Sequence, residues 1–247
     1  MRRVPAGVVW AGVALAVAVA AYLVAGVVRQ RPYRYASEPL HDRETAADFT
    51  LQSASGPVSL SDFDGDVVLL FFGYTHCPDV CPTEMMRLAQ IHRRLPGQDR
   101  ERVHVLMVTV DPERDTPALM ASYAQAFDPS FIGLSGTPAQ IADVAGAFYV
   151  SYERAGQTRP DRYFVNHTSA AYVLNTERQL ALIYGYDQLA AEQAHVARDL
   201  SHLLRGRDEP AGRTRAGRPE GGVPAAPAPA GGRSVPADGL PWRGAGS

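Results

Sequence analysis

Two short, uninterrupted apolar runs constrain the fold of this chain more than any other feature. The first, DVVLLFF, covers residues 66–72, and the second, VHVLMVTV, covers residues 103–110. Both are rich in β-formers and show no polar alternation, which is typical of strands that are covered on both faces. Such strands belong to sheets with helices packed against them. The two runs therefore predict the centre of a buried sheet.

Helices are predicted between and after these strands. Apolar residues recur at helical spacing from Met85 to Leu95, and a proline suits the first turn of a helix, so a helix is expected to begin near Pro82. The remaining elements are expected as helices at 118–127, 139–150 and about 187–204, a short strand at 131–134, and a hairpin over 168–186 with its turn at TERQ. This order predicts an α/β sandwich with a mixed central sheet, whose sites gather at the carboxyl ends of strands.

The chain divides by composition into four parts. Residues 4–28 carry no charge and are long enough to cross a bilayer as a helix. They exceed the apolar core of a signal peptide, so residues 1–29 are predicted to be an N-terminal membrane anchor, with a cleaved signal peptide as the alternative. Residues 30–48 are expected to form a tether, and 49–205 one domain. The Gly, Pro and Ala of residues 206–247 predict a disordered tail.

Both cysteines of the chain, Cys77 and Cys81, follow the first predicted strand directly, in FFGYTHCPDVCP. Their spacing permits a disulfide or two thiolates on one metal ion. A helix that begins at Pro82 places both sulfurs near its positive end, which favours the thiolate forms. The formal net charge is only −2 and no basic face points to nucleic acid. The pair is therefore expected to carry local metal or thiol chemistry.

Two thiolates and one imidazole would suit copper better than structural zinc. Structural zinc normally takes four protein ligands, and no second cysteine pair exists here. Soft sulfur holds Cu(I), and imidazole accommodates Cu(II). A copper site of this kind requires a third ligand from elsewhere in the chain.

His167 is the preferred candidate for that ligand. It lies in YFVNHTSAAYVL, just before a predicted strand and after a polar insert at residues 153–162 whose length is typical of a functional loop. An ordinary loop histidine is the alternative. The other histidines are expected to serve elsewhere: His76 pointing away from the cysteines, His92 on the exposed side of the first helix, His104 within the second strand, and His195 and His202 in the last helix.

Three motifs occur in an order that resembles one known family. They are GYTHCPDVCP at residues 73–82, VDPERDTP at 110–117 and VNHT at 165–168. Together with the predicted anchor, they make the chain similar to the Sco/SenC family, which are membrane-anchored, thioredoxin-like copper proteins required for the assembly of cytochrome c oxidase. The resemblance implies a thioredoxin-like sandwich in which Cys77, Cys81 and His167 bind one copper ion, as Cu(I) or Cu(II).

The resemblance also implies a function and a location. A metallochaperone of this kind would deliver copper to the copper-bearing subunit of cytochrome c oxidase or prepare its CuA site. Other copper carriers and thioredoxin-like reductants are further partners. The domain would lie on the extracytoplasmic, periplasmic side of a bacterial membrane, with the mitochondrial inner membrane as the less favoured alternative. One departure is Asn166, where the family commonly has aspartate, and we expect it to alter how the neighbouring imidazole is held.

The same cysteines also suit a different class of function. In an extracytoplasmic thiol-disulfide reductase or redox sensor, one of Cys77 and Cys81 attacks a disulfide and the other resolves the mixed disulfide. Whether the protein is an enzyme therefore stays open. A peroxiredoxin is less well supported, because the proline and threonine that its pattern places before the cysteine are absent at the corresponding positions before Cys77.

The DPERDTP segment admits two interpretations. Asp111 and Arg114 could support the cysteine loop or contact a partner. In the alternative, the segment is a structural turn in which Asp115 or Thr116 caps the next helix.

Overall fold

Strand β3 (Val67–Gly73) lies in the middle of a five-stranded sheet, and all seven of its residues are buried. The strand order is β5-β4-β3-β8-β9. Strands β3, β4 and β5 are parallel, whereas β8 and β9 run antiparallel to their neighbours. The two apolar runs of the sequence form β3 and β4, so the predicted mixed central sheet is confirmed.

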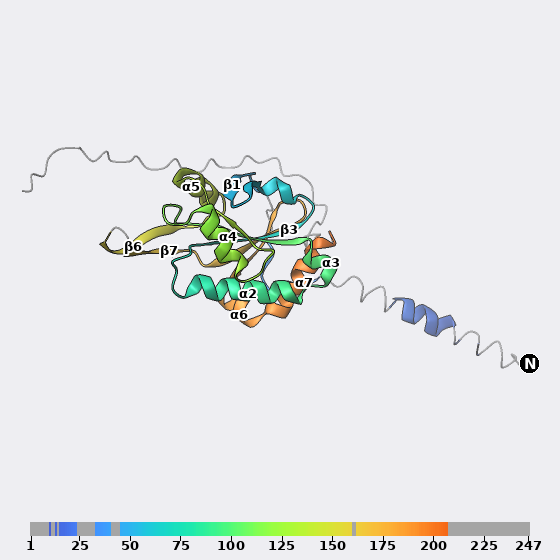
Figure 1. The fold of residues 1–247 in the computed structure, drawn as a ribbon. Helices are drawn as coiled ribbons and strands as arrows, with labels where there is room; N and C mark the ends of the chain where they lie inside the picture. Colours follow the sequence, from blue (N-terminus) through green and yellow to red (C-terminus); the bar gives the residue numbers. More distant parts are fainter. Residues whose placement is uncertain are drawn as a thin grey trace, which may run out of the picture. The chain divides into compact units, whose positions relative to one another are not determined.

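The structure is a computed structural model and describes residues 10, 13, 15–23, 33–40, 45–159 and 162–206 (Figure 1). Its elements in chain order are β1 (Thr50–Ser53), β2 (Gly56–Ser59), η1 (Leu60–Phe63), β3, α2 (Val80–Arg94), α3 (Gly97–Arg100), β4 (Val103–Thr109), α4 (Pro117–Gln125), β5 (Ile132–Leu134), α5 (Pro138–Ala147), β6 (Tyr152–Arg159), β7 (Arg162–His167), β8 (Ala170–Leu174), β9 (Leu180–Gly185), α6 (Tyr186–Ala191) and α7 (Gln193–Leu204).

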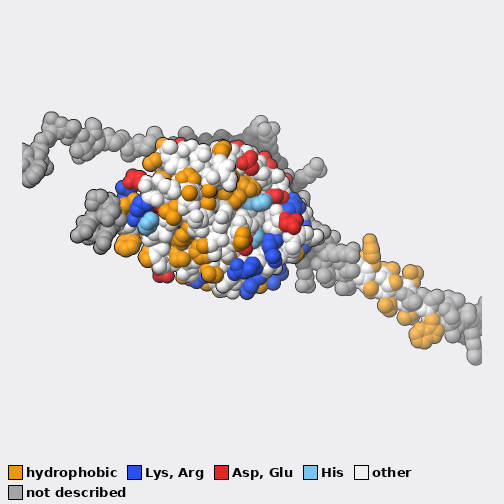
Figure 2. Space-filling model, in the orientation of Figure 1, with side chains coloured by type: hydrophobic (Ala, Val, Ile, Leu, Met, Phe, Trp, Pro, Cys, Tyr) orange, Lys and Arg blue, Asp and Glu red, His pale blue; other side chains and the backbone are white. Residues whose placement is uncertain are grey.

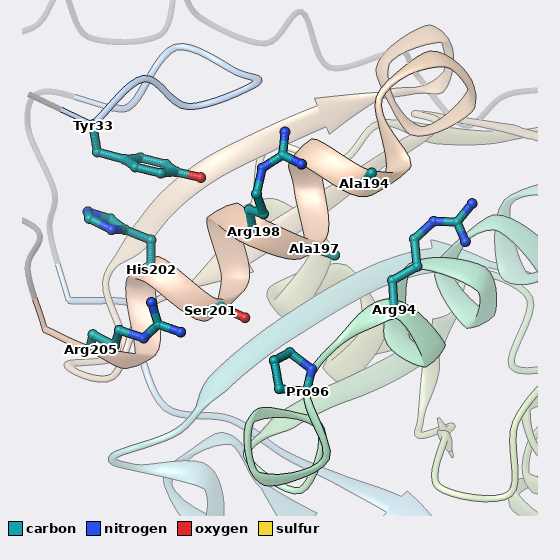
Figure 3. A pocket seen from close by; sticks show the side chains of 9 residues that line it. All are labelled: Tyr33, Arg94, Pro96, Ala194, Ala197, Arg198, Ser201, His202 and Arg205. Carbon is teal, nitrogen blue, oxygen red and sulfur yellow. The ribbon is translucent and has the colours of Figure 1, made fainter.

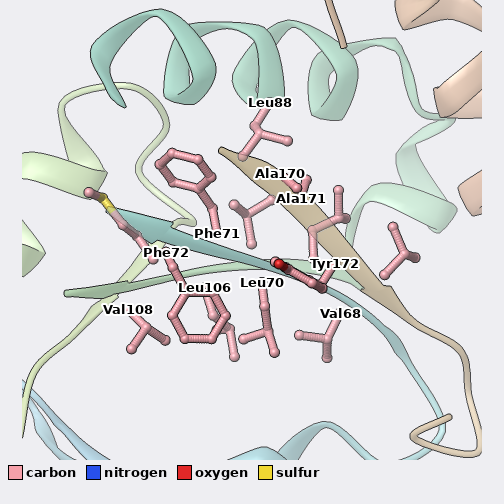
Figure 4. Packing of buried hydrophobic residues seen from close by; sticks show 14 of the residues in the cluster. Val68, Leu70, Phe71, Phe72, Leu88, Leu106, Val108, Ala170, Ala171 and Tyr172 are labelled. Atoms are coloured by element: carbon pink, nitrogen blue, oxygen red, sulfur yellow. The ribbon is translucent and has the colours of Figure 1, made fainter. Parts of the chain in front are cut away.

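Helices cover both faces of the sheet. Helices α2, α6 and α7 lie on one face, and α4, α5 and the β1–β2 hairpin lie on the other (Figure 1). Neighbouring residues of β3 point to opposite faces. Phe71 points toward Leu88 of α2, whereas Phe72 packs on the other face against Tyr172 and Phe148, with ring centroids 5.8 and 5.9 Å away (Figure 4). The core therefore has two layers, and the predicted α/β sandwich is confirmed.

Three elements differ from the sequence-based expectations. The polar insert at residues 153–162 was expected to be irregular, but it belongs to the antiparallel β6–β7 hairpin. The hairpin escaped detection because the described side chains of β6 are half-buried or exposed, so no apolar alternation marks the strand. The predicted last helix is interrupted at Glu192 and forms α6 and α7. Helix α2 begins at Val80, two residues before the expected Pro82.

The segment that precedes the predicted domain is attached to it. Asp199 of α7 is fully buried and accepts hydrogen bonds from the Tyr33 hydroxyl (2.7 Å), the Ala36 N–H (2.9 Å) and the Tyr184 hydroxyl (2.7 Å). The Ser37 hydroxyl donates to a carbonyl of β9. At Tyr33, Ala36 and Ser37 the chain is thus fixed to α7 and β9.

Few residues at the two ends of the chain are among those that the structure describes. The predicted anchor at residues 1–29 and the predicted tail at 206–247 lie largely outside the described residues, although 15–23 are helical. Within the part of the chain that the structure describes, no helix has both the length and the apolar character needed to cross a bilayer.

Candidate metal centre

Two cysteines that are four residues apart and a histidine 86 residues after the second one meet beside the carboxyl end of β3. Cys77 lies in the loop after β3, Cys81 in the first turn of α2, and His167 at the end of β7. Their two sulfurs and one imidazole nitrogen all lie within 4.8 Å of one another. Among the described residues no other group of three potential ligands lies this close. The residues that the sequence singled out are therefore brought together by the fold.

The ring of His167 is oriented by a backbone carbonyl. Its Nδ1 lies 3.1 Å from the carbonyl oxygen of Thr168. A carbonyl only accepts, so the Nδ1 of the neutral ring carries the hydrogen and donates it. The other nitrogen, Nε2, then has a free lone pair and lies 3.3 Å from the Sγ of Cys81. A histidine that ligates a metal is commonly held in this way.

Two aromatic rings fix the imidazole from the sides. Phe71 and Tyr74 both meet the ring of His167 nearly edge-on, with centroids 6.3 and 6.0 Å away. The Tyr74 hydroxyl accepts a hydrogen bond from the N–H of Val165 on β7 (3.2 Å). The strand that carries His167 is thereby joined to the loop that carries Cys77.

The two thiols differ sharply in acidity. The pKa of Cys77 is lowered to about 5, chiefly by a hydrogen bond from the Cys81 thiol, although partial burial opposes the shift. The backbone N–H of Cys81 also donates to the Cys77 sulfur (3.4 Å). The hydrogen bond that the Cys81 thiol donates to the Cys77 sulfur, together with deep burial, raises the pKa of Cys81. Both cysteines are free, so the pair holds one thiolate at half-exposed Cys77 and one buried thiol at Cys81.

A glycine makes room for the buried sulfur. A Cβ atom on Gly73 would lie 3.0 Å from the Sγ of Cys81 and 2.9 Å from the Cε1 of Phe71. These distances are shorter than ordinary van der Waals contacts. A side chain on the last residue of β3 would therefore force Cys81 or Phe71 to shift.

The buried carboxylate of Asp115 supports the cysteine loop through hydrogen bonds to Thr75. Asp115 is fully buried and accepts hydrogen bonds from the Thr75 N–H (3.0 Å), the Thr75 hydroxyl (2.6 Å) and the Thr109 hydroxyl (2.7 Å). From the sequence, Asp115 was expected only as a cap of the next helix. The structure gives the cap of α4 to Thr116, whose side chain accepts from the N–H of Leu119. No sequence signal separated these two roles, because both residues belong to the same turn motif.

Asp111 and Arg114 contact the strand that carries His167, through Tyr163 of β7. Asp111 pairs with Arg114 and accepts a hydrogen bond from the Tyr163 hydroxyl (2.6 Å). The Arg114 guanidinium lies 3.7 Å from the centroid of the Tyr163 ring. Tyr163 belongs to β7, so the DPERDTP turn contacts both the cysteine loop and the strand that ends at His167.

The remaining described histidines lie outside this cluster. His76 is exposed and contacts the Thr75 hydroxyl. His92 was expected on the exposed side of α2, and this was wrong: it is 3% exposed, and its Nε2 faces the carbonyls of Arg100 and Val103 because α3 and the start of β4 cover this part of the helix. The others contact residues of the domain surface: His104 with Asp66, His195 with the Arg34 carbonyl, and His202 stacked on Tyr33.

Asn166 does not hold the imidazole of His167. It is exposed and faces Glu153 across the β6–β7 pair. The contact at Nδ1 comes from the Thr168 carbonyl instead. The expected influence of residue 166 on the ring is therefore not mediated by a hydrogen bond at that nitrogen.

Comparison with known proteins agrees with this geometry. A family model described as SCO1/SenC matches residues 37–205. The chain is 40% identical to the mitochondrial SCO2 homolog of Mus musculus over 148 residues. That match covers 59% of this chain and 58% of the relative, so the chain spans less than two thirds of that protein.

Two solved structures extend the comparison to the fold. Apo Sco1 from Thermus thermophilus, determined in solution, is 42% identical, with a TM-score of 0.64 over 69% of this chain and 98% of that one. ScoI from Bradyrhizobium japonicum, determined with copper bound, is 35% identical, with a TM-score of 0.59 over 65% of this chain and 99% of that one.

Proposed function

The chain belongs to the SCO1/SenC family, whose thioredoxin-like members bind copper and take part in cytochrome c oxidase assembly, and we propose that it is a copper metallochaperone for that oxidase. Copper is the cargo of such a protein rather than a resident cofactor. The observation that carries the proposal is the convergence of Cys77, Cys81 and His167 within 4.8 Å.

The donor set fits copper on chemical grounds. Two sulfur atoms and one imidazole nitrogen suit copper in either oxidation state. The pKa of Cys77 is lowered to about 5, which favours its thiolate, and the Nε2 of His167 lies 3.3 Å from the Cys81 sulfur. The relative from Bradyrhizobium japonicum was determined with copper bound. We therefore assign one copper ion to Cys77, Cys81 and His167.

The exposure of the ligands suggests how the cargo leaves. The side chain of Cys77 is half-buried and reaches solvent, whereas that of Cys81 is fully buried. Ligands of a recipient would approach beside Cys77 and replace the donors of this chain one at a time. The proposed recipient is the copper-bearing subunit of cytochrome c oxidase. A reductant partner is also required, because a Cys77–Cys81 disulfide has no thiolate to offer copper.

The proposed location combines the sequence of the N-terminal part with the family resemblance. The apolar run within residues 1–29 would anchor the protein in a membrane, and the resemblance to the Sco/SenC family supports placing the domain on the extracytoplasmic side. A periplasmic domain beside a bacterial membrane oxidase would deliver its copper across a short distance.

The function is tested by Cu(I) titration of the reduced full chain against a competing chelator. We expect one equivalent for the natural sequence, no tight binding for Cys81→Ser, and weaker binding for His167→Ala. The matched control is His76→Ala, which removes the imidazole next to Cys77 but outside the cluster. Wild-type affinity in His167→Ala, or tight stoichiometric copper in Cys81→Ser, would refute the assigned site.

The low pKa of Cys77 favours a second candidate function, a thiol-disulfide reductase. The Cys77 thiolate would attack a partner disulfide and release one partner thiolate. Cys81 would then lose its proton to solvent and attack the Cys77 sulfur, which releases the second partner thiolate. The products are an oxidised Cys77–Cys81 pair and a reduced partner. In this case Cys81→Ser should trap the mixed disulfide, and His167→Ala should still reduce the partner.

A further inference from the structure

A basic pocket lies at the end of the domain that is remote from the cysteines. Its volume is about 630 Å³. It is formed where the carboxyl end of α2 meets α7 and the segment at Tyr33 (Figure 3). Its charged lining comes from Arg94, Arg198 and Arg205, and its aromatic lining from Tyr33 and His202, whose rings stack with centroids 3.9 Å apart.

The charge of this pocket is mostly uncompensated. Among the described residues no carboxylate forms an ion pair with Arg94 or Arg198, and Arg205 has only Asp99, at 3.7 Å. The nearby Asp199 is buried and already accepts three hydrogen bonds. Figure 2 shows arginine side chains gathered on this region of the domain. Guanidinium groups bind phosphate oxygens in a forked geometry, so the pocket suits a phosphate-bearing anion.

The position of Tyr33 places this pocket near the proposed bilayer. Tyr33 follows the end of the predicted anchor, Arg29, by four residues. Four residues span at most about 14 Å even when fully extended. Since Tyr33 is fixed by its hydrogen bond to Asp199, the pocket wall that it forms must stay within that reach of the anchor. An anion in the pocket would therefore come from the membrane surface.

We propose that this pocket binds the phosphate of an anionic phospholipid headgroup and docks the domain on the bilayer by this end. The proposal rests on the membrane anchor of the proposed function. Docking by this end would also determine how the copper site is oriented relative to the bilayer. Helix α2 has 15 residues and carries Cys81 in its first turn and Arg94 at its last residue. At 1.5 Å per residue, the two lie about 20 Å apart along the helix axis, so the metal centre faces away from the bilayer.

The test measures lipid retention by the full chain. The protein is held in neutral detergent micelles that contain phosphatidylglycerol or phosphatidylcholine, and native mass spectrometry counts the bound lipids. We expect selective retention of phosphatidylglycerol, and about 30-fold weaker retention by Arg94→Gln/Arg198→Gln, since each arginine near an anionic surface contributes about fivefold. The control Arg154→Gln removes one arginine charge from an exposed position of β6 outside the pocket and should retain the lipid. Unchanged copper binding by the double variant shows that it is folded.

Three outcomes separate the possibilities. Equal retention by the natural sequence and the double variant overturns the pocket assignment. Displacement of the lipid by an equal concentration of inorganic phosphate identifies a free phosphate site and overturns the headgroup. The anchor is tested apart from the pocket by flotation with vesicles of phosphatidylcholine alone: failure to float refutes the anchor, whereas the micelle measurement still reports on the pocket.

Discussion

The carboxylate of Asp115 accepts hydrogen bonds from both the N–H and the hydroxyl of Thr75, at 3.0 and 2.6 Å, across 40 residues of sequence. Thr75 stands two residues before Cys77. Because Asp115 is fully buried, these bonds are shielded from water and hold the loop to the turn after β4. The geometry of the cysteine pair thus depends on a residue outside the cysteine motif.

Replacing that carboxylate should loosen the centre. Asp115→Asn presents an NH₂ group to donors that now face an oxygen, so at least one buried partner loses its acceptor. We expect a loss of about 1–3 kcal/mol in the free energy of unfolding and weaker Cu(I) binding. Urea denaturation and chelator competition measure the two effects. Asp143→Asn, on the exposed side of α5, is the control and should change neither. Wild-type copper affinity in Asp115→Asn would mean that the loop is held in another way.

A methyl group at Gly73 should compete with the buried sulfur. In Gly73→Ala the new Cβ lies 3.0 Å from the Sγ of Cys81, so the sulfur or Phe71 must move. We expect a destabilisation of about 1–3 kcal/mol, as for other overpacked cores, together with weaker copper binding. A double-mutant cycle locates the cause: in a Cys81→Ala background the same substitution should cost less. An equal cost in both backgrounds would assign the clash to Phe71 and to Met107, whose Cε would lie 3.2 Å from the new Cβ, rather than to Cys81.

A second glycine, Gly133, allows helix α4 to pack closely on strand β5, away from the metal centre. A Cβ on Gly133 of β5 would lie 2.1 Å from the carbonyl oxygen of Met120, a backbone atom that cannot rotate away. Gly133→Ala should cost more than about 3 kcal/mol or prevent folding. The control is Gly146→Ala in α5, where no atom lies within 4 Å and the helix gains up to about 1 kcal/mol. Thermal denaturation compares the two, and equal melting temperatures would contradict the close packing of α4 on β5.

The acidity of Cys77 predicts the pH profile of its alkylation. Its lowered pKa keeps the thiolate populated above about pH 5, so the rate with iodoacetamide should rise between pH 4 and 6 and then stay level. The raised pKa and burial of Cys81 should leave that thiol slow throughout. Mass spectrometry of peptides from the reduced, copper-free protein separates the two sites. A Cys77 rate that continued to rise through about pH 8.5, as for an ordinary thiol, would show that Cys81 does not stabilise the thiolate.

The asparagine before the imidazole should matter little to copper. The Thr168 carbonyl holds the ring of His167, and position 166 is exposed. An aspartate at this position would therefore act on the copper site only through its charge, which water screens. We expect Asn166→Asp to change the Cu(I) dissociation constant by less than about threefold, as a screened charge several ångströms away would. Chelator competition on both proteins measures the ratio. A change of tenfold or more would mean that residue 166 contacts the ring in the copper-bound protein.

Local patterns in the sequence predicted much of the architecture. The uninterrupted apolar runs became β3 and β4 because a strand covered on both faces has no polar side to record. The helical spacing after the cysteines became α2. The β6–β7 hairpin was missed because the described side chains of β6 show no apolar alternation. The burial of His92 was missed because α3 and the start of β4 cover that side of the helix, which the helical spacing alone does not record.

The sequence by itself determined the donor types of the centre, the local spacing of Cys77 and Cys81, and the strand that ends beside them. Only the tertiary structure decided the rest. It brings His167 to Cys81 across 86 residues, turns its Nε2 toward the sulfur through the Thr168 carbonyl, and supports the loop from Asp115. Those relationships depend on how β7 and the turn after β4 pack against β3. Spacing along a chain limits which neighbours are possible, whereas burial and hydrogen bonding in the folded state select the ones that form.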